Sequence, residues 1–244
     1  MRRFFIDERR INGNEVILSG QEARHITNVI RLRPGDRFTG IDGKGRLYTL
    51  RVETTGRDVC ACIEKISSQP AVSADIVLAC AIPKKFGMDD IVEKATQLGV
   101  SGIIPMITER TIVRPAAKAI PLKRERWKRI AVEACKQSQR ATLPEIYDIM
   151  DLPRALDKVE SLGCVNRIMP FVAEGLAHIS DIPMRNKKSA AVFIGPEGDF
   201  TGEEIDLAIK LGFNPVSLGS LVLKVDTACY YSLSVISSRL LNVK

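Results

Sequence analysis

The chain has 244 residues, of which 45% are hydrophobic and 27% are charged, and its formal net charge is +7. This composition is typical of a globular protein and argues against a disordered or fibrous one, while the length favours two domains. No apolar run approaches the roughly 20 residues that span a bilayer, and charge appears too early for a signal peptide, so we expect a cytoplasmic protein.

The cysteines and histidines do not form a metal-binding pattern. Six cysteines are scattered without a C-x-x-C pair, and only two histidines accompany them. Cys60 and Cys62 form the one close pair, and we interpret them as small buried side chains. The sequence therefore predicts no metal.

The first 70 residues have the pattern of short strands. Apolar and polar residues alternate over 47–52 and again over 59–63, with a turn signal at 55–58. Ser19 is positioned to cap a helix that leads towards Ile30. We expect a small β-barrel in residues 1–70, and the polar, proline-containing stretch 67–73 marks its boundary with a second domain, 74–244.

Beyond that boundary, apolar strands alternate with amphipathic helices. Gly99 follows the first of these helices as a C-cap, and Thr201 with Glu204 forms a capping box at the start of another. The expected strands are 76–81, 103–107, 168–173, 190–194 and 216–218, and the expected helices are 88–98, 122–140, 201–211 and one at the C-terminus. This order predicts an α/β domain with a mostly parallel sheet.

Positive charge is concentrated in one segment. Residues 110–140 contain ten Lys or Arg and only two acidic residues, whereas the rest of the chain is nearly neutral. A local excess of this size favours a polyanionic partner.

Two glycine-containing segments are the candidates for chemistry. The predicted strand 190–194 runs into Gly195-Pro196-Glu197-Gly198, and ligands of open α/β sheets bind at the carboxyl ends of strands. The second segment runs from Leu218 and Gly219 through Leu223-Lys224-Val225-Asp226-Thr227-Ala228 into the last helix. Dinucleotide and phosphate-loop fingerprints are absent from the sequence, which argues against nucleotide triphosphate chemistry.

Together these segments resemble the 16S ribosomal RNA uridine N3-methyltransferase family, which belongs to the SPOUT methyltransferase superfamily. The resemblance extends along the whole chain, through His25-Ile26 with Val29-Ile30-Arg31, Lys94 to Val100, Glu109-Arg110, and Arg126-Trp127 to Glu145. It implies a PUA-like β-barrel, then a SPOUT-type trefoil-knotted α/β domain that binds S-adenosyl-L-methionine, a homodimer, and 16S rRNA or the small ribosomal subunit as substrate.

The resemblance also implies where each ligand binds. The cofactor is expected along Gly195, Glu197, Gly198, Leu218, Gly219, Leu223, Thr227 and Ala228. The RNA is expected along Arg2, Arg3, Arg31, Arg110, Arg114, Arg126, Arg129, Lys136 and Arg140.

Methylation at N3 of uracil needs a group to accept a proton and a cation to stabilise the anion that forms. We assign these roles to Asp226 and Lys224, with Glu197 as a weaker candidate for either. An N-cap is an equally good interpretation of Asp226. Cys229 is a rival nucleophile, as in C5 methylation, but its apolar helix favours a place in the core.

The chain departs from the family pattern at three places. Lys224 and Asp226 stand where the family usually has Arg and Glu, Asp199 replaces a second glycine, and Gly87 replaces a basic residue. The alternative function is a non-catalytic RNA-binding or ribosome-assembly factor with a degenerate methyltransferase domain. The sequence leaves the target nucleotide and the form of the substrate open.

Overall fold

The computed structural model describes residues 3–69, 74–84, 87–185 and 189–240. Contacts divide the chain into two compact units. Unit 1 comprises Met1–Ala71 and Val132–Leu143, and unit 2 comprises Val72–Ala131 and Pro144–Lys244. Helix α3 (Ile120–Gln137) contributes its first part to unit 2 and its end to unit 1. Residues 70–73 of the predicted boundary segment, 67–73, lie outside the described residues.

Unit 1 is built on a six-stranded sheet in the order β1-β4-β5-β6-β3-β2. The strands are β1 (Arg3–Phe5), β2 (Ile11–Asn12), β3 (Glu15–Leu18), β4 (Arg37–Ile41), β5 (Arg46–Thr54) and β6 (Val59–Ser68). Among the named strands of the described residues, β1 and β4 pair in parallel and the other neighbours pair antiparallel. In the described part of the chain no pairing joins β2 to β1, so the expected barrel is a curled half-barrel.

The alternating residues of β5 and β6 form the core of unit 1. Leu50, Val52 and Ala61 are fully buried, as the period-two pattern predicts. The predicted cap is wrong, because the Ser19 side chain makes no capping hydrogen bond at α1 (Gly20–Arg24), which continues as a π-helical turn, η2 (His25–Ile30). Cys60 and Cys62 lie on the half-exposed face of β6 rather than in the core, which corrects our interpretation of that pair.

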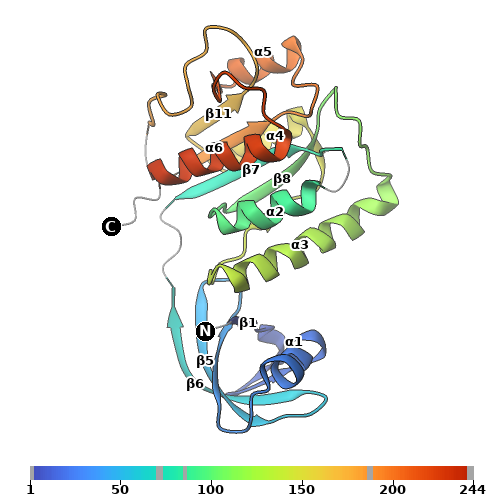
Figure 1. Cartoon of the computed structure of the whole chain (residues 1–244), viewed down its shortest axis with the longest axis vertical. Helices are drawn as coiled ribbons and strands as arrows, with labels where there is room; N and C mark the ends of the chain where they lie inside the picture. The colour runs from blue at the N-terminus through green and yellow to red at the C-terminus, as the bar shows by residue number, and fades with distance from the viewer. Residues whose placement is uncertain (1–2, 70–73, 85–86, 186–188, 241–244) are drawn as a thin grey trace. The chain divides into compact units, whose positions relative to one another are not determined.

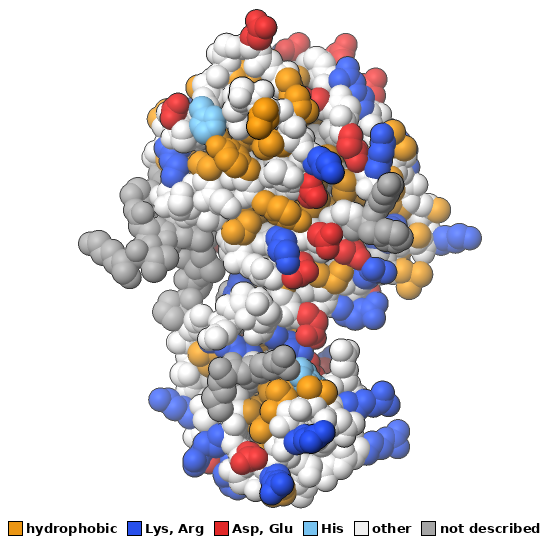
Figure 2. All heavy atoms as spheres, viewed as in Figure 1, with side chains coloured by type: hydrophobic (Ala, Val, Ile, Leu, Met, Phe, Trp, Pro, Cys, Tyr) orange, Lys and Arg blue, Asp and Glu red, His pale blue; other side chains and the backbone are white. Residues whose placement is uncertain are grey.

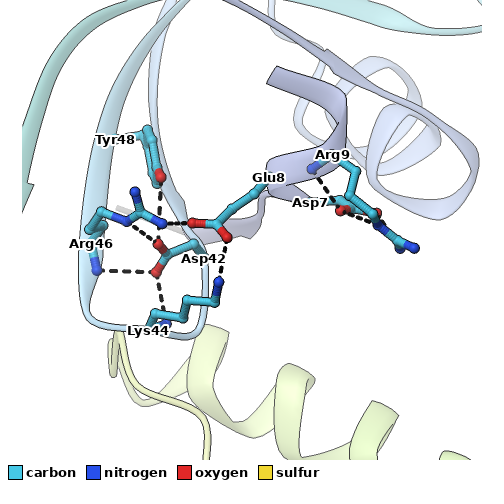
Figure 3. Close-up of polar contacts among 7 residues, drawn as sticks. All are labelled: Asp7, Glu8, Arg9, Asp42, Lys44, Arg46 and Tyr48. Atoms are coloured by element: carbon cyan, nitrogen blue, oxygen red, sulfur yellow. Dashed lines mark hydrogen bonds and ion pairs between the residues drawn. The ribbon is translucent and has the colours of Figure 1, made fainter. Parts of the chain in front are cut away.

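An ion-paired turn joins β4 to β5 (Figure 3). The buried carboxylate of Asp42 accepts hydrogen bonds from the backbone N–H groups of Lys44 and Arg46 and from the Arg46 guanidinium. Glu8, in the short 3-10 turn η1 (Glu8–Arg10), pairs with the side chains of Lys44 and Arg46. The negative charges of Asp42 and Glu8 are therefore balanced by the positive charges of Lys44 and Arg46. We interpret this cluster as structural.

Unit 2 is built on a seven-stranded sheet in which every recorded pairing is parallel. The order is β10-β8-β7-β12-β11-β13, and β9 also pairs with β8. The strands are β7 (Asp75–Ala81), β8 (Gly102–Ile107), β9 (Glu145–Ile146), β10 (Met150–Asp151), β11 (Asn166–Pro170), β12 (Ser189–Ile194) and β13 (Asn214–Val216). The parallel α/β sheet agrees with the sequence-based prediction.

Helices cover both faces of this sheet (Figure 1). Helices α2 (Gly87–Gln97), α3 and α6 (Val225–Leu240) pack on the face that carries Ile76 and Leu78. Helices α4 (Leu152–Ser161) and α5 (Gly202–Lys210) pack on the face that carries Val77 and Ala79. Alternate residues of β7 thus pack into two different hydrophobic cores. Because both faces of such a strand are buried, its sequence is a continuous apolar run. A short 3-10 turn, η3 (Ala117–Ala119), leads into α3.

Two strands end earlier in the structure than the sequence predicts, and both early ends lie at the carboxyl edge of the sheet. The strand expected at 168–173 ends at Pro170, and the strand expected at 216–218 is β13, which ends at Val216. Both end where β11 and β13 stop pairing with one another. Residues beyond these ends are free to leave the sheet and form loops beside the end of β12.

Candidate active site

A cavity of about 150 Å³ lies at the carboxyl ends of β11, β12 and β13. Its walls are the segments that follow these three strands, together with Val225 and Ala228 of α6. Because the strands are parallel, their carboxyl ends lie at one edge of the sheet, where the three segments converge.

The cavity brings together most of the residues predicted to hold a cofactor. Its lining includes Gly195, Glu197, Leu218, Gly219, Leu223 and Ala228. Gly198 and Thr227 lie outside the lining. The wall formed by residues 170–173 was missed, since it depends on the position of β11 between β12 and β13.

The local geometry favours glycine at two positions in these walls. A Cβ on Gly195 would approach the Phe200 ring to 3.1 Å, closer than ordinary van der Waals contact. Gly219 has a φ of +113°, which side chains disfavour. Backbone is therefore the surface that these positions offer to a ligand.

The first wall, residues 195–200, is tied to two neighbouring loops by its own acidic side chains. Glu197 Oε1 accepts a hydrogen bond of 2.8 Å from the backbone N–H of Lys84, after β7. Asp199 Oδ2 accepts one of 2.9 Å from the N–H of Val172, after β11. One oxygen of the Glu197 carboxylate is thus engaged in holding the wall, which gives this residue a positioning role.

Asp199 also has an unusual backbone conformation. Its φ is +60°, in the left-handed region where glycine is preferred. Its side chain accepts the N–H of Phe200 through Oδ1 at 2.8 Å. Asp and Asn tolerate this region better than other non-glycine residues, so the aspartate found at a glycine position of the family retains the turn.

The second wall, residues 218–224, has fewer ties. Ser217 Oγ accepts from the N–H of Gly219 at 3.1 Å, and beyond it Leu221 and Val222 are 76% and 80% exposed. Within the described residues, no side-chain hydrogen bond joins 220–223 to the rest of unit 2.

The start of α6 places both predicted catalytic residues beside the cavity, outside its lining. Lys224 is exposed, and its carbonyl accepts the N–H of Ala228 at 2.8 Å. Asp226 is the second helical residue, so the N-cap interpretation is wrong. Its Oδ1 accepts from the N–H of Thr227 at 2.7 Å, and Oδ2 has no partner among the described residues.

Two neighbouring groups in α6 are held in their neutral forms. Burial raises the pKa of the Cys229 thiol well above its ordinary value, and Cys80 lies 3.5 Å away, sulfur to sulfur. Burial, followed by the negative charges of Asp226 and Asp90, raises the pKa of Tyr230. Cys229 is fully buried in the core, as predicted, and is not available as a nucleophile.

The cations predicted to contact RNA fall in both units. In unit 2, Arg110, Arg114, Arg126 and Arg129 are exposed. On the face of unit 2 drawn in Figure 2, basic and acidic side chains are interspersed. Arg126 pairs with Asp89, so its charge is partly compensated.

In unit 1, Arg31 is exposed, whereas Arg3 and Arg140 are half-buried. Lys136 is buried between Glu22 and Glu133, at 2.7 and 2.9 Å, which corrects its placement on the exposed helix face. Arg2 lies outside the described residues.

Neither a metal centre nor a membrane span is found in the described part of the chain. No group of three or more His, Cys, Asp or Glu there could hold a metal ion. No helix among those residues is long and apolar enough to cross a bilayer.

Comparison with known proteins relates both units to RNA methyltransferases. Residues 70–237 match the RNA methyltransferase domain, and residues 18–65 match the RNA methyltransferase PUA domain. The ribosomal RNA small subunit methyltransferase E of Synechocystis sp. is 32% identical, over 92% of this chain and 73% of the relative. That of Bacillus subtilis is 28% identical, over 97% of this chain and 96% of the relative.

Solved structures agree over nearly the full length. The ribosomal RNA small subunit methyltransferase E from Neisseria gonorrhoeae, bound to S-adenosyl methionine, superimposes with a TM-score of 0.85, 31% identity and 98% coverage of both chains. A methyltransferase from Legionella pneumophila in complex with the same cofactor gives 0.87, 28% identity and 97% coverage of both. With its PUA-like half-barrel and its parallel α/β domain, the chain belongs to the ribosomal RNA small subunit methyltransferase E family.

Proposed function

We propose that this protein transfers a methyl group from S-adenosylmethionine to N3 of a uridine in 16S rRNA. The observation that carries the proposal is the cavity at the carboxyl ends of β11, β12 and β13. Two separate segments of the chain, each singled out by its glycines, form two of its walls. The cofactor-bound relatives support the same assignment.

The walls fit this cofactor in their chemistry. Backbone at Gly195, Leu218 and Gly219 supplies polar groups at close approach, while Ile194, Leu223 and Ala228 supply apolar surface for an adenosine. When bound, S-adenosylmethionine supplies an electrophilic methyl group on a sulfonium. The rest of the reaction depends on the side chains of the protein.

Asp226 and Lys224 are assigned the chemistry on the uracil. The carboxylate oxygen Oδ2 of Asp226 is available to accept the N3 proton or to orient the base. The exposed Lys224 is close to it in sequence and stabilises the anion that forms. Because N3 lies on the pairing edge, the uridine is unpaired or flipped out when it reacts.

Three further assignments accompany the activity. Residues 1–70 form the RNA-binding domain and residues 74–244 the methyltransferase domain, with Arg31, Arg114 and Arg129 contacting phosphates. The protein is a homodimer, which the exposed Leu221 and Val222 beside the cavity support. It acts on the small ribosomal subunit in the cytoplasm.

The test is methyl transfer to defined substrates. Purified protein is incubated with labelled S-adenosylmethionine and either free 16S rRNA or small subunits from cells that lack the gene, and the nucleosides are then identified by mass spectrometry. We expect 3-methyluridine at one site. Tight cofactor binding without any methyl transfer to either substrate would instead favour the non-catalytic assembly factor.

A further inference from the structure

We infer that Arg110 is a positioning residue for the cofactor wall and that its main partner is the protein backbone rather than RNA. This inference rests on the proposed function. Arg110 Nη1 donates a hydrogen bond of 2.7 Å to the carbonyl of Gly198 and one of 3.2 Å to the carbonyl of Phe200. A single guanidinium nitrogen thus holds the wall at two points.

The two carbonyls flank the strained position of the wall. Asp199 lies between them with its φ of +60°. Hydrogen bonds from a charged donor are stronger than those between neutral groups, so the guanidinium favours the conformation in which both carbonyls face it. Arg110 therefore stabilises the left-handed turn, while the Asp199 side chain ties the same turn to Val172 on the other side.

The position of Arg110 is itself determined by a buried turn. Thr108 and Thr111 are both almost completely buried, and their hydroxyl oxygens lie 2.9 Å apart. The Thr111 hydroxyl also accepts the N–H of Thr108, and the N–H of Thr111 donates to the carbonyl of Thr108. These bonds close a compact turn that leaves residues 109 and 110 at its tip.

Glu109, the other residue at the tip of this turn, is bonded to the start of α5, directly after the wall. The N–H of Glu109 donates to Glu204 Oε1 at 2.8 Å, while Oε2 of the same carboxylate accepts the N–H of Thr201. The capping box of α5 is thereby joined to the loop after β8. The turn at 108–111 therefore holds residues 195–200 at one end and the start of α5 at the other.

Gly198 lies outside the cavity, but it packs against the side chain of Arg110. A Cβ added to Gly198 would lie 3.4 Å from both Cβ and Cδ of Arg110. The aliphatic part of the Arg110 side chain therefore lies beside the backbone of Gly198, whose carbonyl its guanidinium binds. Gly198 thus contributes to the wall through its contact with Arg110 and does not line the cavity.

The experiment separates this role from RNA binding with two variants. Arg110→Met retains the aliphatic stem and removes the donors, and Arg129→Ala removes an exposed cation whose one recorded bond is a 3.4 Å contact to its own helix. Calorimetry measures the Kd for S-adenosylmethionine, and filter binding measures the Kd for rRNA over a range of salt.

Arg110→Met is expected to raise the cofactor Kd about tenfold and to leave the rRNA Kd and its salt slope unchanged. Arg129→Ala is expected to show the reverse, with the salt slope reduced by about one. Arg110→Lys retains the charge and is expected to give an intermediate cofactor Kd. Unchanged rRNA binding by Arg110→Met also shows that the variant is folded.

The outcomes that overturn the inference are distinct from failure of the function. If the wild-type protein binds the cofactor and Arg110→Met binds it equally well, Arg110 does not position the wall. If Arg110→Met lost rRNA binding and bound the cofactor normally, Arg110 would be an RNA-binding residue and not a positioning residue. If the wild-type protein itself does not bind the cofactor, the proposed function fails.

Discussion

The two walls of the cavity differ in how firmly the protein holds them. Residues 195–200 are tied by Glu197, Asp199 and Arg110 to the loops after β7, β11 and β8. Among the described residues, the hydrogen bonds of 218–224 are those between Ser217 and Gly219 and the one that the carbonyl of Lys224 accepts within α6. One wall is therefore organised by several hydrogen bonds before a ligand arrives, whereas the other has few such bonds.

This difference suggests a division of labour. The organised wall lowers the entropy cost of binding, because its backbone donors and acceptors are already in place. The exposed wall carries Leu221 and Val222 and leads directly into Lys224 and Asp226. Ordering of this wall by the cofactor or by a second subunit would fix the approach to the proposed catalytic pair at the start of α6.

The largest effect is expected from Asp226→Asn, which leaves the organised wall unchanged. The amide cannot accept the N3 proton, so we expect turnover to fall about 100-fold or more, with the cofactor Kd within twofold of wild type. Single-turnover methyl transfer and calorimetry measure the two quantities. Asp206→Asn, on the exposed side of α5, is the matched control. Full activity of Asp226→Asn would remove the carboxylate from the mechanism.

A smaller effect is expected from breaking a tie of the organised wall. Asp199→Ala loses the bond to Val172 and keeps a side chain at a φ of +60°, so we expect the free energy of unfolding to fall by about 1–2 kcal/mol. Asp199→Gly loses the same bond but removes the strain, so it should be less destabilised. Urea unfolding distinguishes them, and equal losses would show that the backbone conformation contributes nothing.

Substitutions of side chains in the exposed wall should scarcely change the free energy of unfolding. Leu221→Ser and Val222→Ser alter side chains that are already in solvent, so we expect changes in unfolding free energy within about 0.5 kcal/mol. Cofactor affinity or dimerisation should weaken instead, as measured by calorimetry and analytical ultracentrifugation. A large loss of stability in the monomer would mean that this wall is as firmly packed as the other.

The smallest effect is expected in the chemical labelling of the cysteine thiols. It tests whether the start of α6, next to the exposed wall, is as accessible to solvent as that wall. Burial raises the pKa values of Cys135 and Cys164 to about 11, and Cys229 is fully buried. At pH 8 the reactive thiolate is therefore scarce at these positions. We expect iodoacetamide to label only Cys60 and Cys62 in the native protein, as read by mass spectrometry. Rapid labelling of Cys229 would contradict this expectation and would support Cys229 as the rival nucleophile.

Hydrophobic period and capping signals were sufficient for most of the fold. The capping box of Thr201 and Glu204 is present as predicted, and Gly99 has the positive φ of a C-cap. Helix α4 went unpredicted, although Asp151 caps it and Leu152, Ala155 and Val159 recur at helical spacing. The trefoil knot stays a prediction, because strand order and pairing do not report how the chain threads.

The site was predicted less completely, for a physical reason. Residues 170–173 complete the cavity only because β11 pairs with both β12 and β13, and such pairing is set by the whole sheet. The ties of Glu197 and Arg110 likewise join residues 113 and 88 positions apart in sequence. A charge pattern marks Arg110 as a cation but cannot show that its guanidinium meets backbone carbonyls.

Hydrogen exchange of the two walls, with and without S-adenosylmethionine, tests the central claim most directly. We expect the hydrogen-bonded amides of Asp199 and Phe200 to exchange slowly even without cofactor, and the amides in 218–224 to exchange rapidly alone and to slow markedly when the cofactor is added. If exchange in both segments were unaffected by saturating cofactor, the cavity between them would not be its binding site.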